Sequence, residues 1–174
     1  MMQKIISQTI WFVLLVLLQA LVFNNIHIGG YAIPMPYLYF LLTLPSTLDR
    51  GYLLLWAFGL GFCVDLFSNT TGVIAASLTL VAFVRPYVLN IFVSREKAED
   101  GYEPGAVDMK WGPFFRYAAV LTLLHCLLAF TIEAFSLANW EELLLRIGTS
   151  FVLTLLIICA FESIRYGGAK SKKA

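Results

Sequence analysis

Charged residues are scarce in this chain of 174 residues: they make up 13% of it, whereas 60% of the residues are hydrophobic. A soluble domain has about 25% charged and about 45–50% apolar residues. A water-soluble fold of this length cannot hide so much apolar surface, because much of a small domain lies outside its core. The same composition excludes disorder, collagen and coiled coil. The sequence therefore predicts an integral membrane protein.

Cysteine and histidine are rare as well, with three and two residues. Cys63, Cys126 and Cys159 lie inside apolar runs without CxxC spacing, and only the adjacent His125 is near one of them. We expect the cysteines to be small buried hydrophobes rather than disulfide or metal ligands. One histidine at membrane depth also falls short of the usual ligand set for a haem held between helices.

Motifs of catalysis are missing too. The chain has no HExxH, no Gly-x-Ser nucleophile matched to an intramembrane histidine, no series of spaced aspartates for a metal-bound diphosphate and no glycine-rich phosphate loop. A net charge of +1 gives no electrostatic case for nucleic acid. We therefore expect no enzyme activity, no catalytic residue, no cofactor and no metal.

Long apolar runs, by contrast, recur along the chain, and a bilayer core of about 30 Å needs about 20 helical residues. The sequence predicts one transmembrane domain over 1–174, an all-α bundle of six helices with a cytoplasmic loop at 94–113 and a cytoplasmic tail at 165–174. The predicted spans are 5–23, 33–48, 51–67, 73–93, 114–135 and 141–164.

Two of these spans need comment. Only Lys4 precedes the first, and no small-residue cleavage site follows it, so we expect a retained span rather than a removed signal peptide. Pro34 and Pro36 suit the first turn of the second span, where a missing amide donor costs least, and Pro45 is expected to bend it.

The positions of the 12 Lys and Arg residues set the orientation. In the six-span arrangement, all of them except Arg146 lie on one side of the membrane or nearer to that side. The same side carries both termini, the turn at 49–50 and the loop at 94–113. The positive-inside rule makes that side cytoplasmic. The three outer turns are short, so no outer domain is expected.

A charged side chain inside a membrane span costs free energy, so such a residue is rare and is first considered as a functional candidate. Asp65 and Arg146 lie at matching depths in spans 51–67 and 141–164, which predicts an ion pair between them, with Glu142 one turn above Arg146 on the same face. The alternative is that Asp65 caps the turn at 68–72 and Arg146 extends outward.

A second pair is possible between Arg85 and Glu162 at the cytoplasmic level, although Glu162 could instead bond Arg165 at i+3. His125, near the midplane of span 114–135, could be a proton relay or a metal ligand. A lone histidine without a carboxylate at matching depth favours a hydrogen-bonded packing role.

Small and amide side chains indicate close helix contacts. Ala57, Gly59 and Gly61 give span 51–67 a small-residue face, and Gln8 and Gln19 share one face of span 5–23. These patterns predict tight bundling, without saying whether the neighbouring helix belongs to this chain or to a partner.

The chain combines Gln19 in the first span, a Pro-led second span, the motif Gly61-Phe62-x-x-Asp65-Leu66-Phe67 and Gly72. With these residues it resembles, over essentially its whole length, the family of rod shape-determining proteins called MreD. A six-span architecture of this length adds as much to the resemblance as the motif does. One departure is that members often have Pro-Asp opening the second span, whereas Pro36 is followed by Tyr37 in the Pro-Tyr-Leu-Tyr form of Bacteroidetes-type sequences.

The resemblance implies a non-catalytic scaffold of the bacterial cytoplasmic membrane that maintains cell shape by organising peptidoglycan synthesis in the elongation complex. The implied partners are the bitopic protein MreC, the actin-like MreB filament, the RodA glycosyltransferase, its penicillin-binding transpeptidase and the lipid bilayer. The family is similar in fold to the substrate-binding subunits of vitamin transporters. The alternative is therefore a small-molecule binding subunit of a transporter, which would need a polar, aromatic-lined cavity that opens outward.

Overall fold

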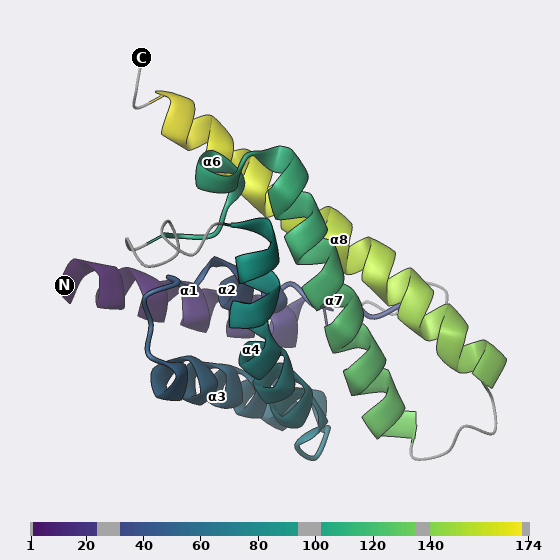
Figure 1. Ribbon diagram of the computed structural model, residues 1–174. Helices are drawn as coiled ribbons and strands as arrows, with labels where there is room; N and C mark the ends of the chain where they lie inside the picture. The colour runs from purple at the N-terminus through teal and green to yellow at the C-terminus, as the bar shows by residue number, and fades with distance from the viewer. Residues whose placement is uncertain (1, 24–31, 94–101, 135–139, 172–174) are drawn as a thin grey trace.

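The computed structural model describes residues 2–23, 32–93, 102–134 and 140–171, and the part described is helical with no β-strand. The helices are connected in chain order and pack largely as sequential neighbours (Figure 1): α3 lies against α4, α4 against α7 and α7 against α8. Their bounds are α1 Met2–Leu21, α2 Leu38–Thr43, α3 Arg50–Ser68, α4 Val73–Phe92, α6 Ala106–Met109, α7 Trp111–Ala134 and α8 Trp140–Ser171.

Four of these helices are long and apolar enough to cross a membrane, namely α3, α4, α7 and the segment Trp140–Gly168 of α8. They confirm the helices expected at 51–67, 73–93, 114–135 and 141–164. In α1 the apolar stretch is the shorter segment Gln8–Leu21. A crossing by α1, the side of the termini and the total of six spans stay predictions.

The second predicted span is wrong as a continuous helix. Residues 33–48 are helical only at Leu38–Thr43, and six residues rise about 9 Å, far less than a bilayer core of about 30 Å. Pro34 and Pro36 precede this short helix and Pro45 follows it, so amide donors are missing at both ends. The residues from Pro34 to Leu42 are all buried, so the segment lies inside the bundle.

Irregular backbone at membrane depth is tolerated only where protein satisfies its polar groups. Two hydroxyls of α8 do so here. The Ser150 Oγ accepts the amide of Ile33 at 2.9 Å, and the Thr154 Oγ1 accepts the amide of Met35 at 3.1 Å. The segment therefore depends on α8 for the hydrogen bonds that a helix would have made internally.

The helix bounds also correct the predicted cytoplasmic loop and tail. The loop expected at 94–113 contains α6, and α7 already begins at Trp111. The helix α8 continues to Ser171, so much of the tail expected at 165–174 is helical. Gly167 and Gly168 weaken a helix by about 1 kcal/mol each, but no proline removes an amide donor there, so the helix continues.

The outward faces of the long helices carry many large apolar side chains. Large hydrophobic side chains stand exposed on α3, α4 and α8, such as Leu55, Leu66, Phe83, Ile91 and Leu156, each more than half exposed. Apolar surface of this extent does not occur on soluble monomers. It supports the prediction that lipid surrounds the bundle.

Candidate functional site

The motif around Asp65 forms the corner between α3 and α4. The buried Asp65 carboxylate accepts the amides of Ile74 at 3.0 Å and Ala75 at 2.8 Å, and the hydroxyl of Thr70 at 2.6 Å. The first amides of a helix have no partner inside it and carry a partial positive charge. A carboxylate nine residues upstream thus caps α4 from the end of the preceding helix.

Two glycines make this corner possible. A Cβ added at Gly61 would lie 2.4 Å from the Cα of Ala75, so only glycine lets α3 approach the start of α4 this closely. Gly72 has a φ of 79°, in the left-handed region that glycine adopts without strain, and it immediately precedes α4. The turn expected at 68–72 is therefore confirmed, and the motif fixes the geometry of a helical hairpin.

The predicted ion pair between Asp65 and Arg146 is wrong. Among the described residues no salt bridge joins them, because the Asp65 oxygens face the amides of α4, and Arg146 Nη2 pairs with Glu142 Oε1 at 3.0 Å on its own helix. The alternative for Asp65, a cap at the turn, is confirmed, as is the shared face of Glu142 and Arg146. Asp65 and Arg146 were predicted at the same depth in the membrane, but the same depth does not determine to which side of its helix each side chain points.

The predicted pair between Arg85 and Glu162 is also wrong. Arg85 is fully buried on α4 and donates to the Tyr117 hydroxyl at 2.9 Å and to the carbonyls of Leu42 and Leu44. The Tyr117 hydroxyl in turn donates to the Leu42 carbonyl at 3.1 Å. Helix α2 ends at Thr43, so its last carbonyls need partners, and a cation is the strongest donor available.

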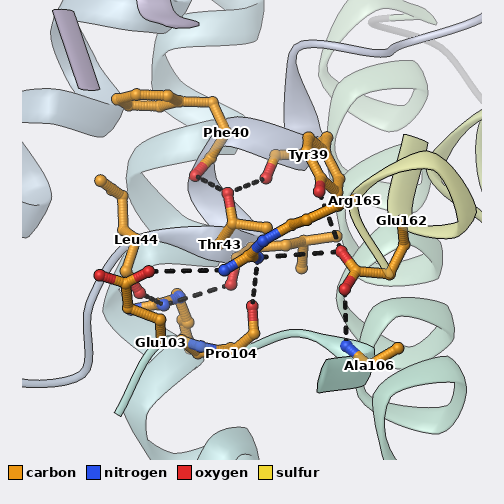
Figure 2. A network of polar contacts seen from close by, with 11 residues as sticks. Tyr39, Phe40, Thr43, Leu44, Glu103, Pro104, Ala106, Glu162 and Arg165 are labelled. Atoms are coloured by element: carbon orange, nitrogen blue, oxygen red, sulfur yellow. Dashed lines mark hydrogen bonds and ion pairs between the residues drawn. The ribbon is translucent and has the colours of Figure 1, made fainter. Parts of the chain in front are cut away.

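Glu162 instead joins three parts of the chain (Figure 2). Its Oε2 accepts the hydroxyl of Tyr39 at 2.9 Å and its Oε1 accepts the amide of Ala106 at 2.7 Å. Arg165 lies one turn further along α8, with Nη1 3.8 Å from the same Oε2. The i+3 alternative for Glu162 is therefore confirmed.

The stretch from Tyr102 to Met109 is held against the segment that follows α2 and against the C-terminal part of α8 by hydrogen bonds and an ion pair. The amide of Ser46 donates to the Tyr102 carbonyl at 2.8 Å, and Arg165 Nη2 pairs with Glu103 Oε2 at 3.4 Å. Burial, together with the smaller effect of the Asp108 carboxylate, raises the pKa of Tyr102 to about 12, so the phenol is uncharged near neutral pH. These contacts were not predicted from the sequence, because backbone atoms of the loop make most of them.

His125 has the packing role that we expected. It is fully buried on α7, and its Nε2 lies 2.9 Å from the hydroxyl of Tyr37. In the described part of the chain no three His, Cys, Asp or Glu side chains lie close enough to hold a metal ion, and all three cysteines are free.

The remaining candidate residues divide between core and surface. Gln19 is buried on α1, which agrees with a helix-facing amide. Gly59 has nothing near its missing Cβ, and Phe62 is half exposed and stacks on Phe58 at 6.0 Å between ring centroids. Of the small-residue face, only Ala57 and Gly61 are buried.

Sequence reasoning missed the buried hydroxyls that hold the second segment. Their common signal is a hydrogen-bonding group within an apolar run, which must find a partner when buried. The residues are Tyr37, Tyr39, Tyr117, Ser150 and Thr154.

A groove of about 650 Å³ is hollowed between α1, the α2 segment and the C-terminal part of α8. Tyr39 lines its buried side and packs edge-on against Trp11 of α1 and tilted against Phe161 of α8. Glu103 and Arg165 line one end.

Together, the buried polar side chains bind backbone amides and carbonyls in places where helices end or chain segments meet. With four helices long and apolar enough to cross a membrane, this is an all-helical arrangement that is compatible with a membrane protein and is held together by internal hydrogen bonds. No family model, no curated protein and no solved structure matches this chain.

Proposed function

We propose that this protein is a non-catalytic scaffold of the bacterial cytoplasmic membrane that maintains rod shape by organising peptidoglycan synthesis, as the MreD family does. The observation that carries the proposal is the Gly61–Asp65–Gly72 corner. The residues of the resemblance coincide with a close helix crossing, an α4 cap and a left-handed turn. They are the kind of residues that a family would share to keep one bundle geometry.

The buried charges support a structural role in the same way. Asp65, Arg85 and Glu162 each form hydrogen bonds to backbone groups and to hydroxyls of this chain. A protein that organises partners needs a rigid arrangement of faces, and these bonds supply rigidity. The partners in this proposal are an MreC-like bitopic protein, an MreB-like filament, and a RodA-type glycosyltransferase with its transpeptidase.

The transporter-subunit alternative needs a cavity that opens to the outer face. The groove lies instead at the end of the bundle that carries Pro45, Glu103 and Arg165, which the charge pattern predicts to be cytoplasmic. Its position therefore favours the scaffold over a receptor for an external vitamin.

Depletion in the native host tests this proposal. Cells that lose the protein are expected to round up, with the ratio of length to width falling toward unity, and to lose organised wall insertion, measured by pulse labelling of new peptidoglycan. Re-expression of the wild-type chain is the control and restores rods. Depleted cells that stay rod-shaped but need an added vitamin would contradict the scaffold and support the transporter subunit.

A further inference from the structure

Lys110, which joins α6 to α7, holds a backbone conformation that glycine adopts readily and other residues do not. Its φ is 65° and its ψ is 159°. This region of backbone space is essentially confined to glycine, and any other residue is disfavoured there about fivefold to 150-fold. Among the described residues, the other non-glycine residue with a positive φ is Asn69, whose φ of 54° and ψ of 32° are ordinary left-handed values for asparagine at the end of a helix. Lys110 is therefore strained, whereas Asn69 is not.

The side chain of Lys110 does not benefit from this conformation. It is exposed, and it adds a positive charge at the start of α7, where the helix dipole disfavours a cation. The carbonyl of Lys110 accepts the amide of Phe114 at 3.3 Å, which a glycine at the same position would do as well. Strain of this kind persists only where the surrounding structure fixes the backbone.

The structure fixes the backbone on both sides of Lys110. On one side, α7 is a continuous helix from Trp111. On the other side lies the stretch from Tyr102 to Met109, called the strap below, whose short helix α6 packs against α7 and α8. The buried residues of the strap are Pro104, Gly105, Ala106 and Met109. The position of the strap therefore imposes the strain on Lys110.

Two charged side chains of α8 hold the strap by its backbone (Figure 2). Glu162 Oε1 accepts the amide of Ala106 at 2.7 Å, and Arg165 Nη1 donates to the carbonyl of Pro104 at 3.5 Å. A Cβ added at Gly105 would lie 2.8 Å from Arg165 Nη1 and 2.9 Å from Glu162 Oε1, so the backbone lies directly against both groups. Because hydrogen bonds to charged groups are about twice as strong as neutral ones, these contacts hold the strap closed against the strain.

Strain and hydrogen bonding thus oppose each other at one junction. If the strap leaves α8, Lys110 can return to a common backbone conformation, while α7 and α8 keep the contacts that they make with each other. Glu103 of the strap and Arg165 line one end of the groove between α1 and α8. Release of the strap would therefore uncover that end of the groove.

We propose that the strap is a conformational switch, which opens from α8 and closes on it while the long helices stay folded. In the closed form, Glu162 and Arg165 hold the strap and Lys110 carries the strain. In the open form, the strain is lost and the end of the groove is accessible. This switch goes beyond the scaffold function and does not depend on it.

Hydrogen exchange of the full chain in lipid nanodiscs, followed by mass spectrometry, measures how often the strap opens. Lys110→Gly relieves the strain of the closed form, so exchange of the Ala106 and Met109 amides is expected to slow about fivefold or more. Lys110→Ala is the matched control, because it removes the same side-chain charge but keeps a Cβ and with it the strain. Its exchange is expected to match that of the wild type.

Glu162→Gln tests the opposing contact. A neutral amide accepts a weaker hydrogen bond than a carboxylate does, so exchange of the Ala106 amide is expected to be about fivefold faster. Glu142→Gln, at the part-exposed ion pair near the other end of α8, is the control and is expected to leave this exchange unchanged. If Glu162→Gln does not fold, the two Lys110 variants still decide the question.

Equal exchange of the strap in Lys110→Gly and Lys110→Ala would overturn the proposal, because strain would then not oppose the closed form. A wild-type strap that exchanges as slowly as the buried part of α7 would overturn it too, since the strap would then not open by itself. The same conclusion would follow if Lys110→Gly slowed exchange in α7 and in the strap by one factor, because the strain would then be released only by unfolding of the whole chain.

Discussion

Replacing Gly61 with alanine is expected to lower the free energy of unfolding by about 3 kcal/mol, because a Cβ at this position collides with backbone. The new atom would lie 2.4 Å from the Cα and 2.7 Å from the amide nitrogen of Ala75, and 2.9 Å from the carbonyl oxygen of Ile74. None of these atoms can rotate away, so α3 and α4 must separate. Separation would also stretch the hydrogen bonds from Asp65 to the same two residues.

Gly59→Ala is the matched control for this prediction. It makes the same change two residues earlier on α3, where nothing lies within 4 Å of the added atom. It is expected to be neutral or to stabilise by up to about 1 kcal/mol, since alanine favours a helix. Both are measured by chemical unfolding in detergent micelles. Equal midpoints for Gly61→Ala and the wild type would show that the close contact of α3 with α4 is wrong.

Replacing Asp65 with alanine is expected to cost about 3 kcal/mol as well. The change removes one carboxylate that accepts two amides of α4 and the hydroxyl of Thr70. Hydrogen bonds to a charged group contribute about 1.5–3 kcal/mol each, and the carboxylate no longer has to be buried, which offsets part of the loss. Asp65→Asn keeps one acceptor oxygen and is expected to lie between alanine and the wild type.

Asp49→Ala controls for loss of an aspartate next to a helix. Asp49 precedes α3 and is exposed, and its side chain makes no capping hydrogen bond, so the expected change is within about 0.5 kcal/mol. Hydrogen exchange of the first turn of α4 locates the effect. Faster exchange there in Asp65→Ala, but not in Asp49→Ala, is the expected result. Unchanged exchange at Ile74 and Ala75 would contradict the cap.

Hydropathy predicted the four helices that are long and apolar enough to cross a membrane, because a lipid-facing helix needs a continuous apolar run of fixed length. It failed at residues 33–48 because a short helix inside the bundle is equally apolar. The three prolines of that segment are also compatible with the first turn and a bend of a membrane span. Because the prolines lack amide donors, they interrupt the helix, and the hydroxyls of Ser150 and Thr154 on α8 accept hydrogen bonds from the backbone of this segment instead.

Depth alone could not predict the partners of the buried charges. Arg85 and Glu162 lie at similar predicted levels, but Arg85 reaches the carbonyls at the end of α2 and Glu162 reaches an amide in the stretch from Tyr102 to Met109. Backbone groups carry no signal in the sequence, so reasoning from side chains pairs charges with each other. His125 was predicted correctly as a packing residue, because an imidazole without a carboxylate at matching depth bonds a neutral partner, here the hydroxyl of Tyr37 at its Nε2.

We propose that the polar residues of the core hold the bundle in shape and take no part in chemistry. The most direct test of this claim is complementation of depleted cells by Asp65→Ala and Asp65→Asn, with cell shape plotted against the amount of folded protein in the membrane. Restoration of rods is predicted to follow folded protein along one line for both variants and the wild type. A variant that is present and folded at the wild-type level, yet leaves the cells round, would contradict the claim.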